Sequence, residues 1–135
     1  MKAIADTGLL VALARSNDQY HEWAAEVGEQ ISWPVLTCEA VLAETAFHLQ
    51  SSKEVLGMLR DDLVRVALDC ARHQEQLYGL ATRYQDRKPD LADLCLIRMS
   101  ELYPRHIVIT VDEEDFRVYR RNKREAIPLL CPPKR

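Results

Sequence analysis

The chain has 135 residues, of which 47% are hydrophobic and 29% are charged, so it is long enough for one soluble domain with a sizeable core. Its formal net charge of -3 at pH 7 excludes nucleic-acid binding through bulk positive charge. Binding to such a polyanion would need a local basic patch or a metal ion.

The first half of the chain alternates short apolar strands with longer helical segments. In chain order we expect a strand over 1–5, helices over 9–14 and 19–30, a strand over 35–37, helices over 38–50 and 52–63, and a strand over 64–68. Turn and capping residues separate these segments, among them Asn17, Pro34 and Ser51.

The second half continues the same alternation. We expect a helix over 70–84, a loop over 85–88, a helix over 90–101, a strand over 106–110, a short helix to 119, a basic loop and a last strand over 127–130. Residues 94–97 are apolar on every side, which is typical of a buried helix. The alternation predicts an α/β fold with a central parallel sheet and helices on both faces.

The cysteines and the hydrophobic segments indicate the cellular compartment. The four cysteines, Cys38, Cys70, Cys95 and Cys131, are scattered, and no two of them form a Cys-x-x-Cys pair. This spacing argues against a zinc site and against a disulfide framework. No apolar run approaches the roughly 18 residues that a membrane helix needs. We therefore expect a soluble cytoplasmic protein whose thiols are reduced and mostly buried.

Four acidic residues stand where they can meet at one edge of the predicted sheet. Asp6 follows the first strand and Asp112 follows the strand over 106–110, at the carboxyl ends where parallel sheets bind ligands. Asp93 lies in the first turn of the buried helix, and Glu44 lies in the middle of another helix. Gathered carboxylates repel one another unless a cation lies among them, and oxygen ligands alone favour Mg²⁺ or Mn²⁺ over zinc. We therefore predict one metal site.

Each acid also has an ordinary structural explanation. Asp90 and Asp93 share one helix face, where they can serve as the N-cap and as a partner of the helix dipole. Asp6 and Asp112 can be turn or N-cap residues, and Glu44 can face solvent. This alternative needs a separate explanation for each acid, whereas a metal site needs one.

Four segments spread over nearly the whole chain contain these acids. They are Ala-Asp-Thr-Gly-Leu-Leu-Val-Ala-Leu at 5–13, Leu-Thr-Cys-Glu-Ala-Val-Leu-Ala-Glu-Thr at 36–45, Asp-Leu-Ala-Asp-Leu at 90–94 and Thr-Val-Asp-Glu-Glu-Asp-Phe at 110–116. In order and spacing they resemble the PIN-domain nucleases, and within them the VapC-type toxins of bacterial toxin-antitoxin modules. Leu94 and Arg98 depart from the family pattern, which has smaller residues there, and this concerns helix packing and partner contacts more than catalysis.

The resemblance implies a fold, an activity and partners. It implies one PIN-like domain over residues 1–135, built as a three-layer α/β/α sandwich, and a metal-dependent endoribonuclease that is the toxin of a toxin-antitoxin system. It implies that Asp6, Glu44, Asp93 and Asp112 are the catalytic residues and bind Mg²⁺ or Mn²⁺. Four more residues are expected to support the metal site: Thr7, Asp90, Thr110 and Asp115. The implied partners are an RNA substrate, a cognate antitoxin protein and a second copy of the chain in a homodimer, with no membrane.

Five basic residues follow the last acidic segment: Arg117, Arg120, Arg121, Lys123 and Arg124. Lys and Arg hold phosphates without reading sequence, so this basic run is a candidate RNA-binding surface. The alternative is a solvated loop that binds no partner.

Two other functional classes remain open from the sequence. A catalytically idle PIN fold would keep the same segments while serving as a scaffold for RNA or protein. A Mg²⁺-binding phosphoacceptor domain also has acids at strand ends, but it needs paired acids after the first strand and a lysine after the last. Here Asp6 is followed by Thr7, and the last strand is followed by Cys131.

Overall fold

The fold is described by a computed structural model that covers residues 1–134. Five short parallel strands form one sheet in the order β3-β2-β1-β4-β7. They are β1 (Ala3–Ala5), β2 (Val35–Thr37), β3 (Val64–Val66), β4 (Ile107–Ile109) and β7 (Leu129–Leu130). The chain therefore forms the parallel sheet that the alternating pattern predicted.

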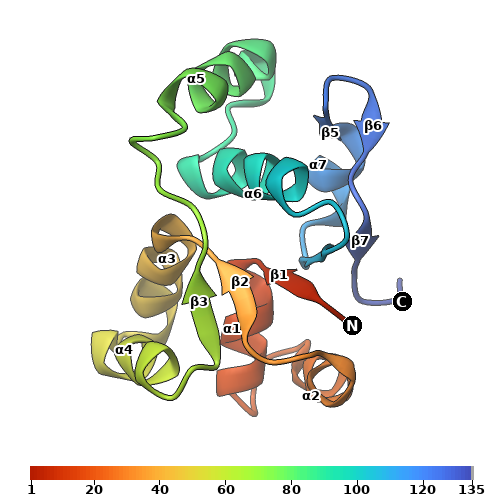
Figure 1. Cartoon of the computed structure of the whole chain (residues 1–135). Coiled ribbons are helices and arrows are strands. Elements are labelled where there is room, and N and C mark those ends of the chain that lie inside the picture. Colours follow the sequence, from red (N-terminus) through yellow and green to blue (C-terminus); the bar gives the residue numbers. More distant parts are fainter. Residues whose placement is uncertain (135) are drawn as a thin grey trace.

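Helices cover both faces of the sheet, so the molecule has three layers (Figure 1). One side carries α1 (Thr7–Ala14), α2 (His21–Gln30), α3 (Glu39–Leu49) and α4 (Ser52–Arg60), and the other carries α5 (Gln74–Arg83), the short 3-10 helix η1 (Gln85–Arg87) and α6 (Leu91–Leu102). The short helix α7 (Glu113–Val118) follows β4. The predicted α/β/α sandwich is confirmed.

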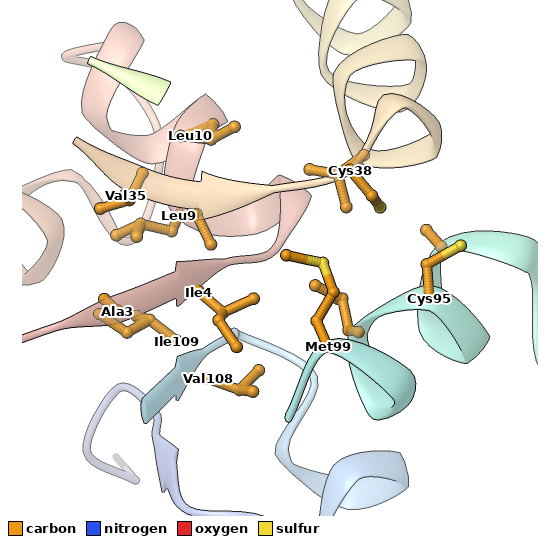
Figure 2. Close-up of a cluster of buried hydrophobic side chains, with 14 of the residues drawn as sticks. Ala3, Ile4, Leu9, Leu10, Val35, Cys38, Cys95, Met99, Val108 and Ile109 are labelled. Atoms are coloured by element: carbon orange, nitrogen blue, oxygen red, sulfur yellow. The ribbon is translucent and has the colours of Figure 1, made fainter. Parts of the chain in front are cut away.

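The central strands and α6 form the middle of the hydrophobic core. All three residues of β1 are buried, and so are Leu94, Cys95, Leu96 and Ile97 of α6. Figure 2 shows Ile4 and Met99 meeting in this core. Each large apolar side chain buried in this way contributes on the order of 2 kcal/mol, which is why a helix that is apolar on every side takes the interior position.

The segment after α7 differs from the expected basic loop. It forms a short antiparallel hairpin in which β5 (Arg120–Arg121) pairs with β6 (Glu125–Ala126). The turn between them needs positive φ at Asn122 and Lys123, with φ of 49° and 71°. Asn tolerates this conformation better than most residues.

The buried apolar residues of the sheet and of the helices around it form one hydrophobic cluster. A single domain over residues 1–135 stays a prediction. None of the helices within residues 1–134 is long and apolar enough to cross a membrane.

Candidate functional site

The four predicted acids line one cleft beside the carboxyl ends of β1 and β4. The cleft has a volume of about 670 Å³, and Asp6, Glu44, Asp93 and Asp112 all line it, together with Asp90. Because β1 and β4 are parallel neighbours, with Ala5 opposite Ile109, the residues that follow them emerge at the same edge. Helices α3 and α6 bring Glu44 and Asp93 to that edge from both layers.

Asp6 is the most buried acid of the cleft and is 8% exposed. It is the N-cap of α1: its Oδ1 accepts a hydrogen bond from the Thr7 amide at 2.7 Å, and its Oδ2 accepts one from the Thr110 hydroxyl at 2.6 Å. Burial raises the pKa of Asp6 to about 6, although both hydrogen bonds oppose that rise. Asp6 therefore caps α1 and also lines the candidate metal site, so the two explanations are compatible for this residue.

Glu44 is held by a contact that the sequence pattern did not indicate. The Thr7 hydroxyl donates a hydrogen bond to its Oε1 at 2.7 Å, which links α3 to the first turn of α1. Burial raises the pKa of Glu44, and the neighbouring charge of Asp90 raises it further. Glu44 is half-buried and lines the cleft.

Asp93 is held from two sides. Asp90 is the N-cap of α6 and accepts a hydrogen bond from the Asp93 amide at 2.8 Å, as the capping pattern predicted. The buried Tyr119 donates its hydroxyl to Asp93 Oδ2 at 3.1 Å. Burial, followed by the charges of Asp90 and Asp6, raises the pKa of Asp93 to about 8.

Asp112 and Asp115 stand closer to Asp93 than the sequence indicated. One carboxylate oxygen from each of Asp93, Asp112 and Asp115 lies within 4.8 Å of the other two. Asp112 is the N-cap of α7, and burial raises its pKa. We call these three residues the acidic trio. Asp115 had been expected only as a supporting residue.

One arginine contacts the acidic trio directly. Arg87 at the end of η1 donates from Nη2 to Asp115 Oδ1 at 2.7 Å. Nothing in the local sequence pattern places Arg87 beside an acid 28 positions away. Arg87 already supplies part of the positive charge that these carboxylates need.

The donor set fits a hard divalent cation. The trio offers only carboxylate oxygens, the ligand type that Mg²⁺ and Mn²⁺ prefer. The pKa values of Asp6, Glu44, Asp93 and Asp112 are all raised, so ionising them together is costly without a cation. The amino terminus of α6 also lies at the cleft, and there the helix dipole stabilises the charge of Asp90.

Two further residues of the cleft were missed from the sequence. His48 of α3 lines the cleft, although its spacing from the acids did not indicate it. Gly8 lies in the first turn of α1, where an added Cβ would collide with the side chain of Val111. Glycine therefore lets α1 approach the residue that precedes Asp112.

The basic run is less uniform than the sequence suggested. Arg121 is buried, and its guanidinium donates to the carbonyls of Ser100 and Pro104 and to the Glu125 carboxylate, at 2.8, 3.2 and 2.7 Å. It therefore fastens the β5–β6 hairpin to α6 and is not exposed for RNA, which corrects the expectation for this residue.

The other members of the run lie at the surface or near it. Arg117 pairs with Glu113 at 3.1 Å, and Arg120 donates to backbone carbonyls at the end of α7. Lys123 and Arg124 are exposed at the hairpin turn. These four residues keep their predicted role as a proposal.

A family model for the PIN domain matches residues 3–122. The chain therefore belongs to the PIN-domain family, which confirms the resemblance read from its four acidic segments.

A solved structure with the same fold is that of Mycobacterium tuberculosis VapC20, which its title describes as a toxin that cleaves the sarcin-ricin loop. The two chains share 20% sequence identity over 79% of this chain and 87% of VapC20, with a TM-score of 0.67. At this identity the likeness shows the fold. No curated protein sequence matches the chain significantly.

Proposed function

We propose that this protein is a metal-dependent endoribonuclease of the VapC type, the toxin of a toxin-antitoxin system. The observation that carries the proposal is the cleft in which a PIN-domain chain gathers four carboxylates of raised pKa. Carboxylates this close together repel one another, and a divalent cation bound in the cleft with a phosphodiester would offset that repulsion. The fold shared with VapC20 supports the choice of RNA as substrate.

Mg²⁺ or Mn²⁺ would be held by the acidic trio together with Asp6 and Glu44. When bound, the ion supplies Lewis acidity toward the phosphate and a lower pKa for an attacking water. The protein's own groups orient the ligands: Thr110 fixes Asp6, Thr7 fixes Glu44, and Tyr119 fixes Asp93.

RNA would be held by the basic residues that follow the last acid of the cleft in sequence. Arg117 lies in α7, Arg120, Lys123 and Arg124 lie in the hairpin that follows it, and Arg87 reaches the trio itself. Such residues hold the phosphate backbone and raise the local concentration of any RNA without selecting its sequence. By family resemblance, we also propose that the protein binds a cognate antitoxin, forms a homodimer and acts in the cytoplasm.

Cleavage of a structured RNA with Mg²⁺ or Mn²⁺ tests the proposal. We expect Asp112→Ala to abolish cleavage while the variant stays folded, because it removes one member of the trio. Asp62→Ala, which changes an exposed aspartate in the turn before β3, is the matched control and should cleave like the parent. EDTA, which removes the divalent ion, should stop cleavage by the parent protein.

Cleavage that persists in Asp112→Ala or in EDTA would remove the nuclease proposal. RNA binding without cleavage in any divalent ion would instead support the idle-scaffold alternative.

A further inference from the structure

Three cysteines that lie far apart in the sequence gather behind the acidic cleft. Cys38 immediately precedes α3, Cys95 lies in α6 two positions after Asp93, and Cys70 lies in the turn between β3 and α5. Figure 2 shows Cys38 and Cys95 at the same end of the core. The proposed nuclease chemistry uses none of these thiols.

The Cys70 and Cys95 sulfurs are close to bonding distance. Their Sγ atoms are 3.4 Å apart. A disulfide has an S–S distance of about 2.05 Å, so the two atoms would need to approach by about 1.4 Å. Cys70 lies in the irregular segment 67–73, where the backbone can shift without breaking a helix. Cys95 lies inside the packed helix α6, so most of the movement would fall on Cys70.

The two thiols differ in access to solvent. Cys70 is half-buried and lines a cavity of about 650 Å³ together with Glu39, Asp69 and Tyr103. Cys95 is buried behind it. A small oxidant that enters this cavity therefore meets Cys70 first. We propose that Cys70 and Cys95 form a redox modification site, which a peroxide closes to a disulfide.

The reaction needs one peroxide for each pair of thiols. The Cys70 sulfur gives up its proton and attacks one peroxide oxygen, the O–O bond breaks, and the departing hydroxide takes up that proton to form water. The Cys95 sulfur then attacks the Cys70 sulfenic acid and loses its own proton. The S–O bond breaks, the second water leaves, and the S–S bond forms. Two thiols are thereby oxidised, and one peroxide is reduced to two waters.

The disulfide would act on the acidic cleft through α6. This helix carries Asp90 and Asp93 in its first turn, and Arg98 on the same helix donates from Nε to His73 Nδ1 at 3.2 Å, near Cys70 in the turn. Although Cys70 makes most of the closing movement, the remainder falls on Cys95 and shifts α6, and with it the Asp93 carboxylate two positions away. We therefore expect oxidation to weaken cation binding. This coupling rests on the proposed metal site, whereas formation of the disulfide does not.

Mass spectrometry of the purified protein treated with hydrogen peroxide tests the modification. We expect the loss of two hydrogens per chain, a cross-linked peptide that joins Cys70 to Cys95, and full reversal by dithiothreitol. Cys131→Ser is the matched control and should behave like the parent, while Cys70→Ser and Cys95→Ser should form no such link. A parent in which peroxide forms no Cys70–Cys95 link, or joins Cys38 to Cys95 instead, would overturn the inference.

Mn²⁺ titration of the oxidised and reduced parent tests the coupling to the cleft. The oxidised parent should bind Mn²⁺ several-fold more weakly and recover after reduction, and peroxide should leave Mn²⁺ binding by Cys70→Ser unchanged. Equal binding by both forms of the parent would refute the coupling. A parent that binds no Mn²⁺ in either form would refute the proposed metal site, while the mass measurement still decides the disulfide.

Discussion

The pKa of Asp93 bears on both roles considered for this residue, which are metal ligand and partner of the helix dipole. Its pKa is raised from the ordinary 3.8 to about 8, so the folded protein without metal favours the protonated carboxyl. The protonated Asp93 carboxyl therefore stabilises the folded state. This stabilisation is complete below the pKa of about 4 that the group has in the unfolded chain, and it is lost as the pH rises through the folded-state pKa of about 8. The sign is the opposite of that for a salt-bridged aspartate, whose stabilising effect is lost as the pH falls.

We predict that Asp93→Asn gains stability relative to the parent as the pH rises from about 5 to about 8 in EDTA. Asn cannot ionise, so it escapes the cost that burial places on the charge. Because Asp93 is half-buried and partly screened, the gain should be about 1–2 kcal/mol. Urea unfolding of both proteins at the two pH values measures it. A variant that is markedly less stable at both pH values would show that helix capping dominates.

The proposed metal binding depends on the negative charge of these carboxylates, so substitutions that remove this charge should weaken it. We predict that Asp6→Asn and Asp93→Asn each weaken Mn²⁺ binding, by roughly tenfold or more, since each removes a charge from the cluster around the cation. Isothermal titration in Mn²⁺ measures the change, with Asp62→Asn as the control on an exposed aspartate. If both cleft variants bind Mn²⁺ like the parent, the four acids do not form one site.

Within the β5–β6 hairpin, one arginine has a structural role and another is proposed to bind RNA. Arg121 is buried with carbonyl and carboxylate acceptors, whereas Arg124 is exposed at the turn. We predict that Arg121→Ala lowers the free energy of unfolding by about 2–3 kcal/mol, because it leaves the carbonyl of the buried Ser100 without its donor and removes the ion pair with Glu125. Arg124→Ala should change stability by less than about 0.5 kcal/mol.

The substitution at Arg124, which should matter least for stability, should matter most for RNA binding. Arg124→Ala should weaken RNA binding and lower the slope of log K against log salt by about one unit, if it contacts one phosphate. Fluorescence anisotropy across a range of salt, paired with thermal unfolding of each variant, measures both properties. An Arg124→Ala variant with the salt slope of the parent would remove this residue from the proposed RNA surface.

At the scale of the whole molecule, the exposed apolar side chains bear on the expected homodimer. Phe47 of α3 is 76% exposed and Leu56 of α4 is 61% exposed, and an apolar groove runs between these two helices. We predict a dimer in solution that Phe47→Ser combined with Leu56→Ser converts to monomer, because self-association is the simplest way to cover this surface. Tyr78→Ser on α5, also highly exposed, is the control.

Light scattering after gel filtration at micromolar concentration measures the mass of each protein. A monodisperse monomer of the parent would contradict the dimer. A dimer that survives the double substitution would place the interface on another face of the molecule.

The layered architecture and the edge at which the acids meet follow from local patterns in the sequence. Strand and helix patterns are set by residues close together in the chain, and parallel strands place their carboxyl ends side by side. Asp6 and Asp112 could therefore be assigned to one edge without coordinates. The capping role of Asp90 was also legible, because an N-cap and its amide partner are three residues apart.

Which side chains touch depends on how elements far apart in the chain pack together. The tertiary structure places a carboxylate oxygen of Asp115 within 4.8 Å of one of Asp93, and the Tyr119 hydroxyl against the same Asp93 carboxylate. It also buries Arg121, whereas the other basic residues of the run lie at the surface or near it. It also brought Cys70 to Cys95 across 25 positions of sequence. These contacts depend on how α6, α7 and the hairpin pack against one another. Packing distances of a few ångströms arise from the sum of many side-chain volumes, and no local pattern in the chain encodes them.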